Sequence, residues 1–270
     1  MPELPEVETT CRGIRPYVVG YNVRAIIVRQ PKLRWQIPTS LHELEGQKIL
    51  SVTRRAKYIL MESAKGTAIL HLGMSGSLRV IDASLAPEKH DHVDIIFSTG
   101  KAIRLHDPRR FGAVLWTRED PLQHKLLCHL GPEPLSDEFD AMFLYKASRK
   151  RKVSVKQFIM NAQVVVGVGN IYASESLFMA GISPKIAAGR ISLARYKKLV
   201  DAIKRVLARS IEQGGTTLRD FIQAEGKPGY FQQQLKVYGR AGEKCTVCKS
   251  QIKQISQRQR SSFYCSNCQK

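Results

Sequence analysis

The first residues of the chain repeat apolar side chains at the spacing of a helix. Successive apolar positions lie three or four residues apart, which places them on one helix face: Leu4, Val7, Cys11, Ile14 and Val18. Pro5 suits a first helical turn, and an early carboxylate such as Glu6 suits the positive end of a helix dipole. The pattern predicts an N-terminal helix that Pro16 kinks or ends late.

Residues 21–116 instead alternate apolar and polar positions in short runs. Glycines and prolines separate the runs, and no strand–helix–strand order recurs. Alternation of this kind predicts an antiparallel β-sandwich or barrel and disfavours a dinucleotide-binding parallel sheet. The alternation is lost over residues 117–145, which contain three prolines, so we expect a domain boundary there.

Helical patterns return in the second half of the chain. We expect one helix to end near Gly167, a tight turn to use Gly167 and Gly169, and a second helix to cover residues 170–179. Glycines in that turn let backbone N–H groups approach a phosphate, with Asn170 near the new helix N-terminus. An ordinary helical hairpin is the alternative interpretation.

Three further stretches of the second half have distinct compositions. Residues 147–156 carry five basic side chains, which fits either a flexible linker or a helix entry that contacts phosphate. A long amphipathic helix is predicted over residues 192–213, with Ser192 as its N-cap and Gly214 as its stop. Residues 215–230 are polar and glycine-rich, and they predict a mobile loop over a pocket.

The charge of the chain narrows the classes of partner. Lys and Arg number 43 against 23 Asp and Glu, which gives a net charge of +20 and a pI near 9.9. Such an excess indicates a polyanionic partner, most simply nucleic acid, with a membrane surface as the alternative. No run approaches the about 18 consecutive apolar residues of a membrane span, and no signal peptide precedes the first helix, so we expect a soluble, intracellular protein.

Four of the six cysteines form two pairs, CTVC and CSNC, with 16 residues between them: Cys245, Cys248, Cys265 and Cys268. That spacing is typical of one structural zinc ion held by four thiolates, and two disulfides are the alternative. In a zinc ribbon the metal holds a β-hairpin rigidly, here with Arg258 and Arg260 at its tip. Of the other cysteines, Cys11 is expected in the core and Cys128 has no identifiable partner.

The opening sequence MPELPE offers a nucleophile. Removal of Met1 turns Pro2 into a chain-terminal secondary amine, whereas an internal proline is an inert amide. An α-amino group titrates at about 7.7–8.0, and the positive end of a helix dipole favours its uncharged form. With Glu3 and Glu6 close by, this amine predicts covalent catalysis. The alternative is a helix that merely begins with proline and glutamate near a free chain end.

Short segments of the strand region combine basic, aromatic or glycine residues: RRAKY, HLGMSGSLR, KHDHVD and DPRRFG. On composition alone, Met74 and Phe111 are expected in the core, and the basic pairs on a solvated surface. His90 and His92 are spaced as zinc ligands could be, but the four cysteines already complete a structural site.

In this order and spacing, these segments resemble the bacterial formamidopyrimidine-DNA glycosylases (8-oxoguanine DNA glycosylases) over essentially the whole chain. MPELPEVE, GVGNIYASE, QGGTTLRDF, KPGYF and VYGR also carry the resemblance. It implies an α+β multidomain fold, with DNA bound in the cleft between the domains. The implied parts are an N-terminal helix plus antiparallel β-sandwich (1–130), a linker (131–146), a helix–two-turn–helix domain (147–235) and a four-cysteine zinc finger (236–270).

The resemblance implies excision of oxidised purines from duplex DNA, followed by strand scission through β,δ-elimination. The damaged base is flipped out of the stack. By the resemblance, Pro2 forms a Schiff base with C1′ of the sugar and Glu3 protonates the sugar ring oxygen. Lys57 is then the proton donor of β-elimination. Arg260 supports δ-elimination and grips the phosphate of the flipped nucleotide.

The resemblance also implies a set of DNA contacts. Met74, Arg109 and Phe111 fill the gap left by the extruded base, which reverses the core interpretation of Met74 and Phe111. Residues 216–230 resemble the loop that closes over 8-oxoguanine. Phosphate contacts are implied for His90, Arg151, Lys156 and Asn170. The implied partner is double-stranded DNA with oxidised bases or abasic sites, bound by a monomer with one structural Zn²⁺ in the bacterial cytoplasm, at the nucleoid.

The chain departs from the family pattern at a few positions. Asn161 and Ala162 stand where the family usually has an acidic residue followed by a polar one, and we expect a helix-local change there. Ser262 stands where threonine is more frequent. No residue that carries chemistry is missing.

Two other functions fit parts of the pattern. The endonuclease VIII-like glycosylases act on oxidised pyrimidines, but their motif usually has glycine where this chain has Leu4. A non-catalytic DNA-binding protein would account for the charge and the finger. The joint presence of Pro2, Glu3 and Lys57 argues against it.

Overall fold

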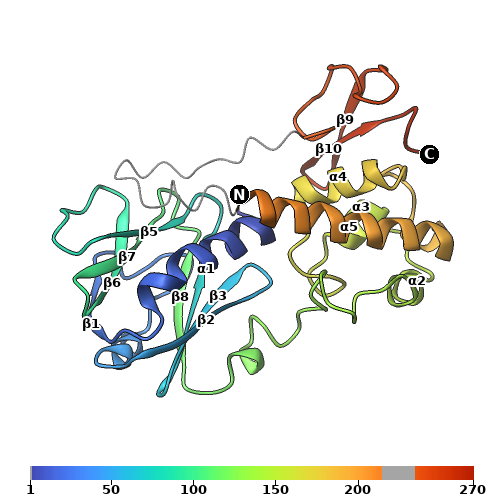
Figure 1. Ribbon diagram of the computed structural model, residues 1–270. Coiled ribbons are helices and arrows are strands. Elements are labelled where there is room, and N and C mark those ends of the chain that lie inside the picture. Colours follow the sequence, from blue (N-terminus) through green and yellow to red (C-terminus); the bar gives the residue numbers. More distant parts are fainter. Residues whose placement is uncertain (1, 215–234) are drawn as a thin grey trace. The chain divides into compact units, whose positions relative to one another are not determined.

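The computed structural model describes residues 2–214 and 235–270 (Figure 1). The described residues divide into two compact units, residues 2–129 with 211–214 and residues 130–210 with 235–270. Each unit has an apolar core of its own. The loop expected over residues 215–230 lies outside the described residues, and so does Met1.

Helix α1 (Leu4–Val18) forms where the apolar repeat predicts it. Its N-cap is Glu3, which forms a reciprocal capping box with Glu6, and Pro5 lies in the first turn. The apolar face is fully buried. Pro16 lies inside the helix, which ends two residues later at Val18, so the expected late ending is confirmed.

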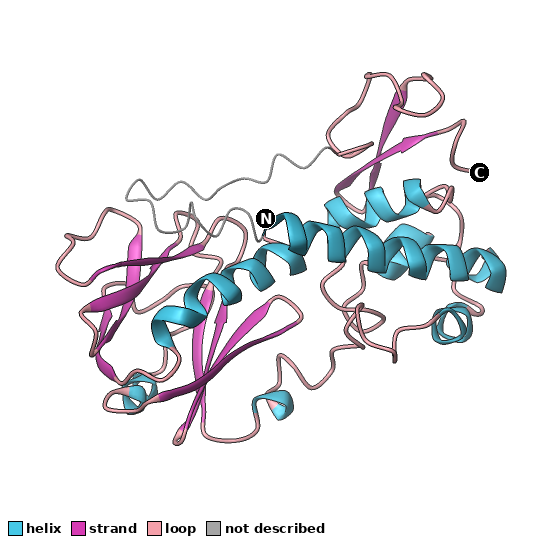
Figure 2. Ribbon diagram, viewed as in Figure 1, coloured by secondary structure: helices cyan, strands magenta, loops and turns pink. Residues whose placement is uncertain are grey.

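Two four-stranded antiparallel sheets follow α1, as the alternation predicts (Figure 2). One has the strand order β1-β6-β7-β5 and the other β2-β3-β4-β8. A single apolar core takes side chains from both sheets and from α1. The strands are β1 (Val23–Val28), β2 (Ile49–Arg55), β3 (Tyr58–Ser63), β4 (Gly66–His71), β5 (Ser77–Asp82), β6 (Asp91–Phe97), β7 (Lys101–His106) and β8 (Ala113–Thr117).

The second unit is helical and ends in a two-stranded hairpin. Helices α2 (Ala141–Ser148) and α3 (Val155–Ile159) begin at polar caps: the carboxylate of Asp140 accepts from the N–H of Phe143, and the hydroxyl of Ser154 from that of Gln157. Inward-facing apolar side chains of all four helices form its core. The elements are α2 (Ala141–Ser148), α3 (Val155–Ile159), α4 (Asn170–Met179), α5 (Leu193–Gly214), β9 (Ile252–Gln257) and β10 (Arg260–Cys265).

The helix boundaries of this unit are partly as expected. The predicted helix 170–179 is confirmed as α4, and the predicted amphipathic helix as α5, with the Ser192 hydroxyl accepting from the N–H of Arg195. The expectation of a helix ending near Gly167 is wrong, because α3 already ends at Ile159. The Asn161 side chain accepts from the N–H of Gln163, and this local hydrogen bond favours a turn over a further helical turn.

None of the helices within the described ranges is both long and apolar enough to cross a bilayer.

Candidate active site and nucleic-acid interface

Pro2 directly precedes the cap of α1. Glu3 is only 1% exposed, and its N–H donates to Glu6 Oε2 at 2.7 Å. The capping box fixes both the backbone and the carboxylate of Glu3. The N-terminal residue that precedes Glu3 is therefore held at the start of the helix, the end with the positive dipole charge.

Lys57 lies in the turn between β2 and β3, after Ala56, which has a positive φ of 54°. Three contacts set the direction of α1 along β2. Arg15 donates to Val52 O, Cys11 Sγ contacts Thr53 O at 3.6 Å, and Arg54 Nε donates to Glu8 Oε2 at 3.0 Å. As α1 is followed toward its N-terminus, the contacts therefore move along β2 toward Lys57.

Pro2, Glu3 and Lys57 thus lie toward the same end of the α1–β2 pair. The side chain of Glu8 pairs with both Arg12 of α1 and Arg54 of β2. These two guanidinium groups outweigh the effect of burial and hold the pKa of the Glu8 carboxyl below its usual value.

His71, at the end of β4, was not singled out from the sequence, although it begins the HLGMSGSLR segment. Burial, together with the cations Arg34 and Lys57, lowers the pKa of His71 from 6.5 to about 4. Its Nδ1 accepts from the N–H of Gly73 at 3.0 Å. The imidazole is therefore uncharged at neutral pH and accepts a hydrogen bond from the loop that carries Met74.

Met74 and Phe111 lie on the surface, so the core interpretation of these two residues is wrong. Their exposed fractions are 40% and 43%. The guanidinium of Arg109 lies over the Phe111 ring, 4.9 Å from its centroid. An exposed methionine, an exposed phenylalanine and an arginine that covers it offer an apolar wedge with one positive charge.

His90 is half-buried and makes ring contacts with His92 and His106. The buried His92 is engaged by the backbone, with its Nε2 2.9 Å from Asp107 O. His106 Nδ1 lies 2.9 Å from Asp91 Oδ1, an oxygen that also accepts from Arg79. His92 and His106 thus have a backbone carbonyl and a carboxylate as partners, and His106 also lies with Glu88 and Asp91 in a group whose ligand atoms are all within 4.8 Å of one another.

Arg260 begins β10, directly after the two-residue turn of Arg258 and Gln259. Both turn residues have positive φ, 46° and 62°. Two such residues in sequence are what a type I′ hairpin turn requires, since its twist matches that of the strands. The predicted hairpin with Arg258 and Arg260 at its tip is therefore confirmed.

Lys156 faces the hairpin and is only 2% exposed. Its ammonium group donates to Ser261 O at 2.9 Å and to Ser262 Oγ at 2.8 Å, and Asn170 Nδ2 donates to Ser261 O at 3.0 Å. Both implied phosphate contacts therefore also hold the hairpin backbone next to Arg260. Ser262, the residue that replaces threonine, keeps the hydroxyl that this arrangement uses.

A pocket of about 170 Å³ opens between α3 and the hairpin. Its lining is rich in cations and amides and contains no carboxylate: Lys156, Gln157, Met160, Asn161, Gln257, Arg258, Arg260 and Ser262. In this lining, Asn161 stands at a position where, by the resemblance, an acidic residue is usual. The exposed Arg151 lies apart from this lining, just after α2, where its carbonyl accepts from the N–H of Gly189.

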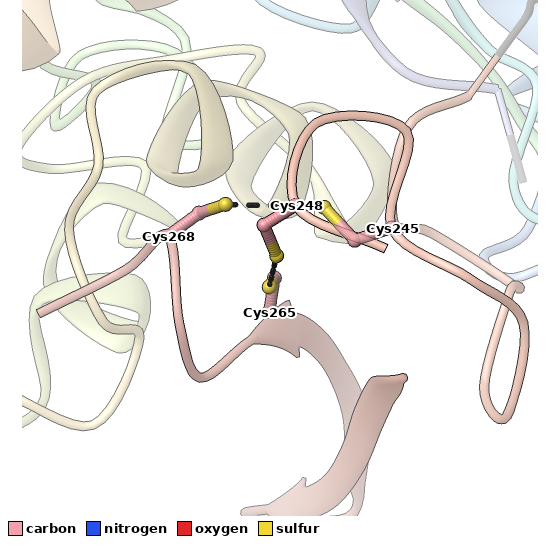
Figure 3. A group of neighbouring side chains, drawn as sticks. All are labelled: Cys245, Cys248, Cys265 and Cys268. Atoms are coloured by element: carbon pink, nitrogen blue, oxygen red, sulfur yellow. Dashed lines mark hydrogen bonds between the residues drawn. The ribbon is translucent and has the colours of Figure 1, made fainter. Parts of the chain in front are cut away.

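The four cysteines converge from the two pairs (Figure 3). Their Sγ atoms all lie within 4.8 Å of one another, with Cys245 and Cys268 3.9 Å apart and Cys248 and Cys265 3.4 Å apart. A tetrahedral zinc ion with Zn–S bonds of about 2.3 Å needs sulfurs about 3.8 Å apart. The four thiols therefore fit one structural zinc ion, and none of them forms a disulfide.

Two buried carboxylates escaped the sequence analysis although both lie in segments it singled out. Glu175, within GVGNIYASE, accepts from the backbone N–H groups of Lys236, Val237 and Tyr238 and so anchors the start of the hairpin module to α4. Asp107, the first residue of DPRRFG, accepts from Ser75 Oγ and from the N–H of Gly112. For Asp107, the available signal was an acidic residue inside a basic segment.

Three family models match the chain in order. They are the formamidopyrimidine-DNA glycosylase N-terminal domain over residues 1–114, the formamidopyrimidine-DNA glycosylase H2TH domain over 130–222, and the zinc finger found in FPG and IleRS over 242–270. A formamidopyrimidine-DNA glycosylase of Stutzerimonas stutzeri is 59% identical over the full length of both chains.

Solved structures of Lactococcus lactis proteins are similar over nearly the whole chain. Formamidopyrimidine-DNA glycosylase non-covalently bound to DNA with an AP site has a TM-score of 0.88 at 30% identity, and covers 99% of each chain. A mutant in complex with Fapy-dG-containing DNA has a TM-score of 0.90 at 31% identity, again over 99% of each chain.

Proposed function

Because the chain belongs to the formamidopyrimidine-DNA glycosylase family, we propose specific roles for its residues in the removal of oxidised purines from DNA. The activity itself is that of a DNA glycosylase with AP lyase activity, acting on duplex DNA and carrying a structural zinc finger. The observation that carries the proposed roles is the convergence of Pro2, Glu3 and Lys57 at one end of the α1–β2 pair.

The first step joins protein and DNA. Once Met1 is removed, the Pro2 nitrogen attacks C1′ of the damaged nucleotide, the C1′–N bond breaks, and the base leaves with the bonding electrons; the nitrogen loses its proton and the departing base gains one. The carboxylic acid of Glu3 gives its proton to the sugar ring oxygen as the ring opens, which leaves an iminium ion between Pro2 and C1′. The rigid cap of α1 keeps the acid beside the nucleophile.

Two eliminations then cut the strand. Loss of a C2′ proton and cleavage of the C3′–O bond release the 3′ phosphate, and Lys57 donates a proton in this step. A second elimination breaks the C5′–O bond, and Arg260 supports it from the tip of the hairpin. His90, Arg151, Lys156 and Asn170 serve the phosphates, while Met74, Arg109 and Phe111 occupy the gap left by the base.

Borohydride reduction tests the central role of Pro2. With Met1-free protein and duplex containing 8-oxoguanine opposite cytosine, borohydride is expected to freeze a covalent protein–DNA adduct. Pro2→Gly replaces the secondary amine with a primary amine and is expected to lower adduct formation and strand scission by about 100-fold or more, because position and basicity of the nucleophile both change. Pro31→Gly is the matched control, since its nitrogen is an amide. Wild-type scission by Pro2→Gly would refute the assignment.

We also infer that the protein associates with the nucleoid and that its chain divides functionally at 1–130, 131–146, 147–235 and 236–270. The net charge of +20 supports the first inference, because it favours non-specific binding to chromosomal DNA. Co-localisation of a fluorescent fusion with DNA in cells checks the association, and limited proteolysis followed by mass spectrometry checks the division.

A further inference from the structure

We propose that Asp107 is a positioning residue that joins the loops carrying Met74, Arg109 and Phe111 into one rigid wedge. The inference rests on the proposed role of these three residues at the extruded base. Asp107 is added to these three residues although it does not itself face DNA, because its side chain is 0% exposed. Asp107 directly follows β7 and opens the loop that carries Arg109 and Phe111.

The carboxylate of Asp107 bonds one loop with each oxygen. Oδ1 accepts from Ser75 Oγ at 3.1 Å, next to Met74. Oδ2 accepts from the N–H of Gly112 at 2.7 Å, next to Phe111. A rigid planar group with two acceptor oxygens thereby fixes the separation of two turns that are more than 30 residues apart in sequence.

The backbone of Asp107 extends the connection to His90. Its N–H donates to His90 O at 3.0 Å, and its carbonyl faces His92 Nε2 at 2.9 Å. The same carbonyl accepts from the N–H of Arg110 at 3.1 Å, which closes the turn that carries Arg109. One buried residue therefore contacts the segment of His90, the loop of Met74 and the turn of Arg109.

Two glycines let the loops touch directly. Gly73 has a φ of +64°, and a Cβ there would lie 2.4 Å from the carbonyl carbon of Phe111 and 2.5 Å from Gly112 N. A Cβ on Gly112 would lie 2.9 Å from His71 O. Backbone thus packs on backbone with no flexible side chain between, so a shift of one turn is transmitted to the other.

The consequence for function is preorganisation. An exposed methionine and phenylalanine on independent loops would have to be ordered each time a base is extruded, and ordering flexible groups opposes binding. With the turns already joined, Met74 and Phe111 enter the duplex as one body. The effect should concern the opening of a paired lesion, because a lesion that is already unpaired needs no wedge.

The test compares single-turnover excision of 8-oxoguanine from a fully paired duplex with excision from the same strand held in an unpaired bubble. Asp107→Ala is expected to slow excision about 10- to 100-fold on the paired duplex and less than about threefold in the bubble, since small misplacements of positioning groups have effects of this size. Asp107→Asn should recover most of the rate: its amide N–H can donate to Ser75 Oγ while its oxygen accepts from Gly112. Equal losses on both substrates would overturn the proposal.

Further variants separate positioning from general destabilisation. Asp120→Ala is the matched control, since this carboxylate also accepts a backbone N–H, that of Leu122, but belongs to an unrelated turn. Where Asp107→Ala does not fold, Ser75→Ala removes one of the two connections and should show the same preference for the bubble. In a Met74→Ala/Phe111→Ala background, Asp107→Ala should cost less than about twofold more; an undiminished extra loss would contradict action through the wedge.

Hydrogen exchange tests the coupling without catalysis. The Gly112 amide should exchange at least about tenfold faster in Asp107→Ala than in the wild-type protein, because it loses its carboxylate acceptor. Unchanged protection of this amide would disprove the connection. If the wild-type protein left both DNA substrates intact, the proposed roles at DNA would fail, and this exchange measurement would still decide whether Asp107 joins the loops.

Discussion

The β-sandwich and the zinc hairpin hold their site residues by different physical means. In the sandwich, the loops with Met74 and Phe111 emerge from a large apolar core to which both sheets and α1 contribute. The hairpin has only a small core, and two of its buried members are the metal-binding Cys245 and Cys265. A short segment that cannot bury enough apolar surface needs a metal to fix its geometry, whereas the sandwich does not.

The two regions also differ in how individual cations and carboxylates are used. Behind the sandwich loops, the buried carboxylate of Asp107 accepts from loop groups. Beside the hairpin, the buried ammonium of Lys156 donates to hairpin acceptors, and the carboxylate of Glu175 accepts three N–H groups at the start of the module. The comparison shows that a small metal-bound module requires anchors from its neighbouring helices to keep Arg260 in place.

Metal removal should have the largest effect and should separate the two regions. Chelation, or Cys248→Ser, is expected to unfold the hairpin and to lower affinity for duplex DNA by at least about tenfold, while the β-sandwich stays folded. Near-ultraviolet circular dichroism and DNA titration check both parts. Cys128→Ser is the control, because this exposed thiol lies outside the cluster. Unchanged DNA affinity after verified zinc loss would contradict the prediction.

Loss of the Lys156 anchor should have an intermediate effect, confined to the hairpin. Lys156→Met keeps most of the side-chain volume but removes the donor to Ser261 and Ser262, at a cost of about 1.5–3 kcal/mol for hydrogen bonds from a charged group. Because Arg260 loses its support, we expect the ratio of δ-elimination product to β-elimination product to fall. The rate of base excision should change less. Lys152→Met, an exposed lysine of the same segment, is the control. A uniform loss of all three steps would speak against a role specific to the hairpin.

The prediction that concerns the sandwich unit alone is a pH dependence of its stability. The pKa of His71 falls from 6.5 in the unfolded chain to about 4 in the folded protein, so between these values the unfolded chain binds more protons. The free energy of unfolding should therefore decrease by up to about 3 kcal/mol as the pH drops from 7 to 4. Urea titrations across this range check it. His71→Asn should flatten the curve, while His129→Asn, at an exposed position, should leave its slope intact.

The sequence predicts local structure well where one periodicity dominates. The apolar repeat of α1, the alternation of the eight sandwich strands and the bounds of α4 are all confirmed. The helix expected before Gly167 is wrong, because the run of valines at 164–166 is apolar without fixing a helix, and the side chain of Asn161 closes a turn instead. A short apolar run does not distinguish a helix from a buried loop.

The candidate site was less accessible to sequence reasoning than the fold. The exposure of Met74 and Phe111 was expected only from the resemblance, since composition places such residues in a core. Lys156 meets its hydrogen-bond partners about 100 residues farther along the chain, and Asp107 meets Ser75, which lies 32 residues earlier. Partners that only the tertiary fold brings together leave no periodic signal in the sequence.

The turn at the tip of the hairpin has a consequence for the evolution of the module. Arg258 and Gln259 occupy left-handed backbone conformations for which asparagine and glycine are the favoured residues. Long side chains there make the isolated hairpin harder to close, by an amount that the metal and the neighbouring helices must compensate. The turn therefore carries a charged residue, Arg258, although a less favourable backbone conformation results. A Gln259→Gly exchange, which relieves the backbone, would show how much this conformation lowers the stability of the hairpin.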